Sequence, residues 1–291
     1  MKKLAAILIA VLCLTVFITP ALAVEPGIGR VTLGANLTED QIEQIYEDFE
    51  IERGSVEEIT VTNDEERAYL AGLVPDRKIG KAALSCIYIE TLEEGSGISV
   101  TTNNINWCTS QMYINALITA GVSDARVKVS APFDVSGTAA LTGVYKAYED
   151  ITGTALDETA KEAAAAELVT TGELAEAIGD EEATQLINEL KKILDQTKNM
   201  TDEELKAEII AIAESQGIEL TEDQIRQIIE LCRMLEKTDI SEWGDKLAQL
   251  GETMKNVQKT TEDVSSFFES VGTFFGNLFK SIGDFFSNLF G

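Results

Sequence analysis

Any catalytic chemistry in this chain has to proceed without histidine, because none of its 291 residues is one. This composition excludes histidine-dependent triads, imidazole metal ligands and histidine pH switches. A serine activated by a lysine would be the natural replacement, but Ser136 and Lys146 lie in no motif of that kind. The 50 acidic residues keep a carboxylate-dependent hydrolase open as a weaker hypothesis, although no spacing singles out a pair. We therefore assign no catalytic residue, no metal ligand and no cofactor, and the balance favours a protein that is not an enzyme.

The cysteines are the other reactive groups, and two of them lie near each other in a predicted hairpin. Cys86 is on the first strand, the turn is at Gly95–Gly97, and Cys108 follows the second strand. Folding this hairpin would bring the two sulfur atoms close, so a disulfide that clamps its open end is one interpretation, and two free thiols are the other. Cys232 falls on the apolar side of a predicted helix and is expected to be a buried, unreactive residue.

Small and hydroxyl-bearing residues open a helix directly after a strand, at Ser136, Thr138 and Thr142. Backbone N–H groups at such a helix start can bind an anion or a carboxylate. The other interpretation, which we favour, is that the small side chains let this helix pack closely on the sheet.

The elements that position these residues alternate between strand and helix. Residues 24–36 are interpreted as a glycine-rich leader. Helices are predicted with caps at Asn63 and at Thr109, and Pro132 is expected to end the last strand. The resulting β-α-β-β-α-β order is that of ferredoxin-like domains, so we predict an α+β fold. β-Branched residues and period-two alternation place the strands at residues 56–62, 83–92, 98–106 and 125–131.

Two further helices flank this unit, and a helical region follows it. Thr38 begins the first flanking helix with a capping box, and the second spans residues 136–148. After Gly153 the strand signals stop. We therefore divide the chain into an α/β domain at residues 24–152 and a helical bundle at residues 153–240. Apolar residues recur at helical spacing in four segments of the bundle, at residues 157–178, 180–196, 201–216 and 221–236.

The last part of the chain, residues 241–291, is predicted to form one long amphipathic helix. Apolar residues from Trp243 to Leu289 recur in alternating steps of four and three, the heptad pattern of a helix that packs along another helix. Eight of the 11 phenylalanines lie between Phe267 and Phe290, where the apolar face widens enough to suit a lipid interface. The residues assigned to this partner or membrane face are Trp243, Leu247, Leu250, Phe268, Val271, Phe274, Phe275, Leu278, Phe279, Ile282, Phe285, Phe286, Leu289 and Phe290.

The N-terminus has the pattern of a secretory signal peptide. Lys2 and Lys3 precede the apolar run Leu4–Ile18, which is short for a membrane span, and an Ala-x-Ala site ends at Ala23. We predict that residues 1–23 are a signal peptide cleaved after Ala23, with an uncleaved anchor as the alternative. The mature protein would be secreted or retained at the cell envelope. Its formal net charge, −27 for the full chain, repels nucleic acid and anionic lipid.

Three segments resemble a known family. They are Ile59–Arg67, Val74–Asp76 and above all Val129–Gly143, in which the run Ala-Pro-Phe-Asp-Val-Ser-Gly-Thr-Ala-Ala-Leu-Thr-Gly is long and specific. In these residues the chain resembles the YpuA-like secreted proteins of Gram-positive bacteria, the domain of unknown function 1002 family. The likeness extends over most of the chain after the leader. The resemblance implies an extracytoplasmic protein, but it implies no reaction and carries over no functional residue.

Together these patterns favour one function and leave an alternative. The favoured function is that of a non-enzymatic secreted or cell-envelope protein, which binds a partner protein or another copy of itself through the C-terminal amphipathic helix. The alternative is a membrane-surface protein whose phenylalanine-rich end inserts in the lipid interface. Neither hypothesis involves a cofactor or nucleic acid.

Overall fold

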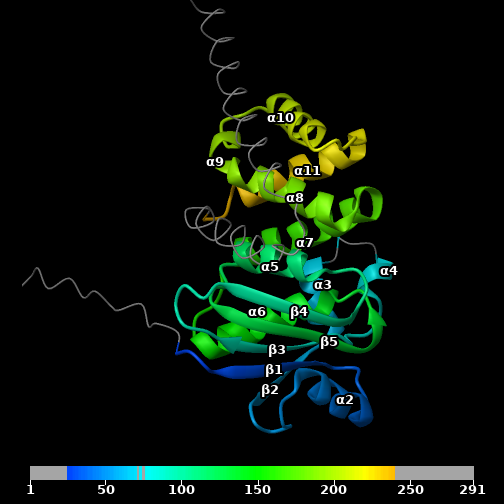
Figure 1. The fold of residues 1–291 in the computed structure, drawn as a ribbon, viewed down its shortest axis with the longest axis vertical. Coiled ribbons are helices and arrows are strands. Elements are labelled where there is room, and N and C mark those ends of the chain that lie inside the picture. Colours follow the sequence, from blue (N-terminus) through cyan, green and yellow to red (C-terminus); the bar gives the residue numbers. More distant parts are fainter. Residues whose placement is uncertain (1–24, 71, 74–75, 240–291) are drawn as a thin grey trace, which may run out of the picture.

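A five-stranded mixed β-sheet forms the base of the fold, shown in Figure 1 as a computed structural model that describes residues 25–70, 72–73 and 76–239. The strands are β1 (Gly29–Gly34), β2 (Glu57–Val61), β3 (Cys86–Thr91), β4 (Ile98–Ile105) and β5 (Ala125–Val135). Their order across the sheet is β2-β1-β3-β5-β4. The pairs β1–β2 and β4–β5 are parallel, whereas β3 is antiparallel to both of its neighbours, so β3 runs opposite to the other four strands.

The predicted α+β class and the predicted chain order of the four strands are confirmed, but the ferredoxin-like topology was wrong. The sheet contains β1, where the sequence indicates only a leader; its residues Val31 and Leu33 alternate with polar ones and pair with β2 and β3. In addition, β5 lies between β3 and β4, so these two strands do not form the predicted hairpin. Neither error concerns local propensity, because both depend on which distant strands pair.

The strand β5 also continues past Pro132, which the sequence predicts as its end. Pro132 lacks a backbone N–H, and this deficit ends strands that need a bond at that position. Here β3 pairs with β5 only as far as Ser130, so no backbone N–H is needed from Pro132 for hydrogen bonding to β3. The strand extends to Val135, which pairs with Ile105 of β4 beyond an irregularity in the register.

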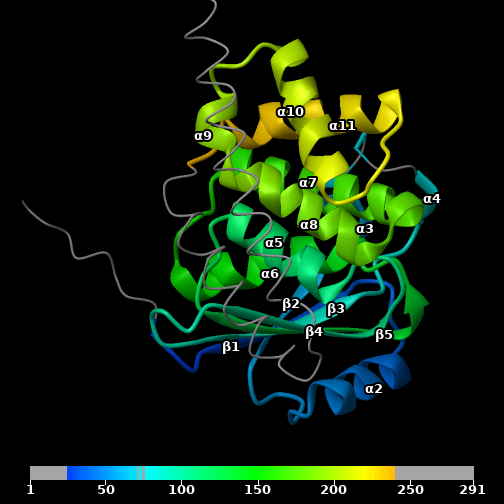
Figure 2. The ribbon, with the colours of Figure 1, turned by 45° about the horizontal axis from the view of Figure 1, so that its top comes forward.

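Helices cover both faces of the sheet. The helix α2 (Glu39–Phe49) lies on one face, where its buried side chains pack on Val31, Leu33 and Cys86. On the opposite face lie α3 (Asn63–Leu70), α4 (Asp76–Ile79), α5 (Ser110–Thr119) and α6 (Thr138–Thr152). Successive side chains of β3 point to opposite faces of the sheet, since Cys86 packs with α2 whereas Ile87 belongs to the larger core on the other face. Figure 2 shows α2 alone beneath the sheet and the other helices above it.

A helical layer is stacked on this second face. It consists of α7 (Glu158–Ile178), α8 (Asp180–Lys192), α9 (Leu194–Thr197), α10 (Asp202–Ser215) and α11 (Glu222–Leu235). The helix α7 packs in both directions, because Leu168 belongs to the core of the sheet and Leu174 to the core of the helical layer. In Figures 1 and 2, α10 and α11 lie farthest from the sheet.

Local capping chemistry sets most helix starts. The capping box predicted at Thr38 is confirmed, and Thr201 and Thr221 form the same box at α10 and α11. The prediction for α3 was wrong by one residue, because Thr62 pairs with Glu65 in the cap. Glu66, three residues after Asn63 and so in the position that would complete a capping box with it, is instead buried in the protein. The helix predicted at residues 180–196 is broken at Ile193 into α8 and α9.

The two ends of the chain lie outside the described residues. These ends include the predicted signal peptide at residues 1–23 and the predicted partner or membrane face between Trp243 and Phe290. Among the helices of the described ranges, none is long and apolar enough to cross a membrane.

Candidate functional site

The cysteines form neither a disulfide nor a reactive thiol among the described residues. Cys86 faces α2, whereas Cys108 lies in the core on the other side of the sheet. Of the two interpretations, the free thiols agree with the structure and the disulfide does not, because the hairpin that would bring the two together is interrupted by β5. Cys86, Cys108 and Cys232 are all free and buried. Burial raises the pKa of each thiol to about 12, so none is a thiolate at neutral pH.

Ser136 and Lys146 are bound to separate partners. The Ser136 hydroxyl donates to the backbone oxygen of Lys78 at 2.8 Å. Lys146 Nζ donates to the backbone oxygen of Thr60 and to the Glu65 carboxylate, each at 2.6 Å. A serine nucleophile needs its base within hydrogen-bond reach, and these contacts direct the two side chains to different parts of the fold.

The junction between β5 and α6 is a site of close packing. Gly137 has a positive φ of 94°, and its carbonyl accepts a hydrogen bond of 2.5 Å from the Tyr113 hydroxyl. A Cβ atom at this position would lie 2.6 Å from Cγ2 of Ile105, which is a clash. Further along α6, Gly143 lies against the sheet and its carbonyl accepts a hydrogen bond of 3.1 Å from the Thr32 hydroxyl. These contacts support the close-packing interpretation of the segment from Ser136 onwards.

A carboxylate does meet the start of α6, but it comes from the chain itself. The Thr138 hydroxyl donates to Glu66 Oε1 at 2.5 Å, and the Asn63 side chain donates to Glu66 Oε2 at 3.0 Å. Glu66 is 1% exposed. Burial raises the pKa of this carboxyl, and the two hydrogen bonds oppose that effect only in part. The expected anion-binding position is thus filled by a side chain of α3.

A second buried carboxylate lies between α5, α7 and α8. Glu167 pairs with Lys191 Nζ at 2.8 Å, and their side chains are 1% and 0% exposed. Lys191 also donates to the Thr119 hydroxyl at 2.8 Å and to the backbone oxygen of Asn115 at 3.1 Å. The Thr119 hydroxyl bonds to Glu167 as well. Burial lowers the pKa of Lys191, and the carboxylate counteracts this effect. The sequence gives no sign of this pair, because charged residues on amphipathic helices are usually solvated.

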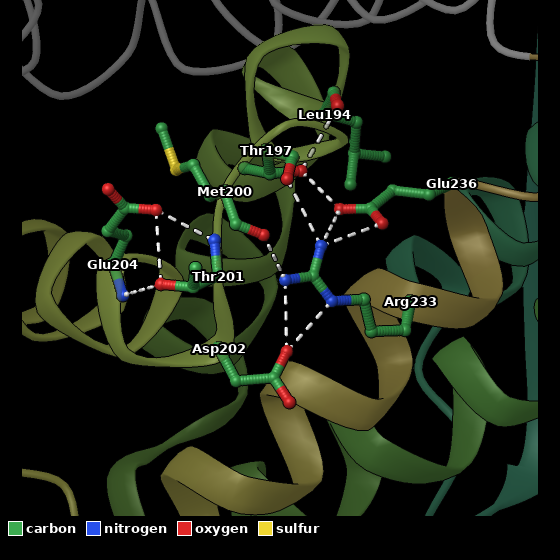
Figure 3. Close-up of polar contacts among 8 residues, drawn as sticks. All are labelled: Leu194, Thr197, Met200, Thr201, Asp202, Glu204, Arg233 and Glu236. Carbon is green, nitrogen blue, oxygen red and sulfur yellow. Dashed lines mark hydrogen bonds and ion pairs between the residues drawn. The ribbon is translucent and has the colours of Figure 1, made fainter.

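Arg233 holds together the outer end of the helical layer, as Figure 3 shows. Its guanidinium donates to Asp202 at 3.0 Å and to the backbone oxygens of Thr197 at 3.1 Å and Met200 at 2.7 Å. It also pairs with Glu236, the residue that follows α11, at 2.9 Å. The arginine fork thus ties α9 and the start of α10 to the end of α11, immediately before the described chain ends.

A hollow of about 530 Å³ lies beside β4, between the start of α5 and the helices α7 and α8. Trp107 is among the residues that line it, and the Trp107 indole N–H donates to Glu176 at 3.0 Å. The ring rests on Gly172, where a Cβ would lie 2.6 Å from it. Lys78 Nζ lies 4.7 Å from the ring centroid and pairs with Glu176. This hollow was not predicted, since its walls come from four separate elements.

The acidic runs that open α3, α8 and α10 do not form a cation site. In the described ranges, no group of three or more cysteine, aspartate or glutamate side chains is arranged to hold a metal ion. Their position in the first turn, where a carboxylate favours the helix dipole, accounts for them.

The fold and these contacts define an α+β protein in which a mixed sheet supports a helical layer and the buried charged side chains Glu66, Glu167 and Lys191 have partners within the chain. The chain belongs to the family described as "Protein of unknown function (DUF1002)", whose profile matches residues 33–266. It is 36% identical over 282 residues to the "Uncharacterized protein YpuA" of Bacillus subtilis (strain 168), and the alignment covers 94% of this chain and 96% of that protein. The family resemblance predicted from the sequence is thereby confirmed. No solved structure matches the chain.

Proposed function

We propose that this protein is a non-enzymatic secreted or cell-envelope protein that binds a protein partner, or a second copy of itself, through its C-terminal amphipathic segment. The observation that carries the proposal is the way the described chain ends. Arg233 ties the end of α11 to α9 and α10, so the following residues leave from a point that the helical layer holds in place. The apolar pattern that starts at Trp243 begins soon after that point.

The pattern of the segment supports a helical partner in particular. A long apolar stripe on a strongly acidic chain has to be covered by something, and steps of four and three are the spacing at which two helices interlock. The signal-peptide pattern that ends at Ala23 supports an extracytoplasmic location. The phenylalanines between Phe267 and Phe290 support a second candidate, a lipid interface, because there the apolar face is wider than a helix pair requires.

The test for a protein partner uses light scattering on residues 24–291. We expect an oligomer, and we expect a chain that stops at Asp239 to be monomeric. Truncation removes the whole segment, so two full-length variants test the apolar face alone. Leu278→Glu places a charge on the apolar face and should dissociate the oligomer, whereas Asn277→Glu places the same charge on the polar face and should leave it intact. Equal behaviour of these two variants would contradict helix pairing.

The lipid candidate is tested on the same proteins by flotation with vesicles of phosphatidylcholine and of phosphatidylglycerol. Flotation that is lost in Leu278→Glu but kept in Asn277→Glu, without any change in light scattering, would favour the lipid interface over a protein partner. If neither light scattering nor flotation depends on the segment, both candidate functions are wrong.

A further inference from the structure

The outer edge of the sheet at β4 differs from most natural edges. Edge strands expose unpaired N–H and C=O groups, and proteins usually protect them with charged residues, proline or short length. Within the described ranges β4 is the last strand on its side of the sheet, and its eight residues include no charge and no proline. Its pairing with β5 is regular from Ile98 to Asn103, and the one irregularity, at Asn104, lies near its end. Ser99, Thr101 and Asn103 are exposed along it. The opposite edge, β2, is shorter and carries Glu57 and Glu58.

The hollow at Trp107 adjoins this edge. Thr102 and Ile105 of β4 line it on one side, and Glu176 of α7 and Asp180 of α8 line it on the other. Side chains alternate between the two faces of a strand, and neighbouring strands keep the same alternation. A strand added next to β4 would therefore point every second side chain towards the helices, and the one opposite Thr102 would enter the hollow.

The charges around the hollow select what can enter it. Lys78 is already paired with Glu176, so these two charges largely offset each other. Asp180 makes no hydrogen bond or ion pair with another side chain in the described part of the chain, and it is exposed to the hollow. With a net charge of −27 for the chain, a cationic side chain is attracted and an anionic one repelled.

We propose that β4 binds an extended segment of a partner protein by strand addition, with a lysine or arginine of that segment in the hollow at Trp107 and its charge directed at Asp180. Backbone hydrogen bonds to β4 provide affinity in this mode, and the hollow provides selectivity. The residues that form this surface come from β4 and from the helices beside it, not from the C-terminal segment, so this proposal can fail without the function proposed above failing.

The proposal is tested with full-length residues 24–291 and synthetic nonapeptides of alternating threonine and valine. One peptide has arginine at its centre, a second has glutamate there, and a third is the arginine peptide N-methylated at alternate backbone nitrogens. We expect the arginine peptide to bind and to slow amide hydrogen exchange between Ser99 and Asn103. The glutamate peptide should bind at least tenfold more weakly. The N-methylated peptide should also lose binding, because it cannot form one side of the ladder.

Two matched variants test the role of Asp180. Asp180→Asn should lower the affinity for the arginine peptide several-fold. The affinity for the glutamate peptide should stay the same or rise slightly. Asp40→Asn, which removes an equivalent exposed charge from the first turn of α2, should change neither. The proposal is overturned if the arginine peptide fails to bind at millimolar concentration, if the N-methylated peptide binds equally well, or if the two variants behave alike. Binding only after removal of residues 240–291 would also overturn it, since the chain's own segment would then occupy the edge.

Discussion

The sheet layer and the helical layer each bury a glutamate that is 1% exposed, and they accommodate it differently. Glu66, beside the start of α6, is held by the neutral side chains of Thr138 and Asn63. Glu167, between α5, α7 and α8, is held by the ammonium group of Lys191. Burial raises the pKa of Glu66, whereas the ion pair of Glu167 keeps both charges in the core.

The difference follows from what each region packs against. The β5–α6 junction brings backbone to backbone through Gly137 and Gly143, and hydroxyl groups from the same segment are available to a nearby carboxylate. Between the three helices Glu167 also accepts from a hydroxyl, that of Thr119, so the difference between the two sites is the added ammonium group of Lys191. A paired charge depends on its partner far more than a hydrogen-bonded neutral group does.

The largest effect is expected from breaking the ion pair. Lys191→Met leaves the Glu167 carboxyl buried without its partner, and should lower the free energy of unfolding by about 3–5 kcal/mol. Lys192→Met, at the next residue, removes an exposed pair with Glu189 and should cost about 0.5 kcal/mol or less. The double variant Glu167→Leu/Lys191→Met should recover most of the loss, because no unpaired charge remains. Urea unfolding measures all three, and equal losses at Lys191 and Lys192 would contradict the contrast between the layers.

The next largest effect is expected at the glycine of the junction. Gly137→Ala has to adopt a positive φ and also clashes with Ile105, and should destabilise the protein by about 2–3 kcal/mol. Gly153→Ala, at the other end of α6, has a φ of 64° but open space around it, and should cost only about 1 kcal/mol. Thermal unfolding of the two variants compares them directly. If Gly137→Ala lost less stability than Gly153→Ala, close packing at Gly137 would not be what maintains the β5–α6 junction.

A pH-dependent effect of opposite sign is expected at two adjacent glutamates. The folded-state pKa of Glu66 is raised, so the stability that it contributes is present below its unfolded pKa and lost as the pH rises through the folded pKa. Glu66→Gln should therefore stabilise the protein at pH 7 relative to pH 4, by about 1 kcal/mol. Burial raises the pKa of Glu65, but hydrogen bonds from Lys146 and Thr62 outweigh it and lower that pKa.

The contribution of Glu65 is consequently present above its unfolded pKa and lost as the pH falls through the folded pKa. Glu65→Gln should destabilise the protein at pH 7 relative to pH 4, by about 0.5 kcal/mol because the ion pair is partly exposed. Urea midpoints measured between pH 4 and pH 8 show how the stability difference between each variant and the unmodified protein changes with pH. If the two stability differences changed with pH in the same direction, the neutral environment assigned to Glu66 would be contradicted.

The smallest effect is expected from cysteine alkylation, which measures how readily each of the three hydrophobic cores opens. Cys86 lies under α2, Cys108 in the core above the sheet and Cys232 in the helical layer. We expect native protein to resist iodoacetamide at all three, because burial raises each thiol pKa to about 12. In graded urea, mass spectrometry of each site reports which layer opens first. A thiol at Cys86 or Cys108 that reacts only after reduction would instead reveal a disulfide.

Features encoded by neighbouring residues could be predicted from the sequence, and features that depend on distant partners could not. The capping box at Thr38, the four strand segments and the helical region after Gly153 each follow from a local pattern. The strand β1 is longer than β2, but the glycines at both of its ends gave the segment the appearance of a leader. The burial of Glu66 and the pairing of Glu167 with Lys191 join residues far apart in the chain, so neither has a local signal.

The central place of β5 determines the order in which the sheet can assemble. The strands β1, β2 and β3 find all their mutual partners before residue 92, so they can form a three-stranded block early. The strand β4 has no partner until β5 has been made, and β5 then joins it to β3 in one step. Such long-range pairing is slow, because the intervening loop has to be ordered first. We therefore expect a chain that emerges N-terminus first to hold the inner edge of β3 open until Ser130 is available, and to assemble as two blocks rather than strand by strand.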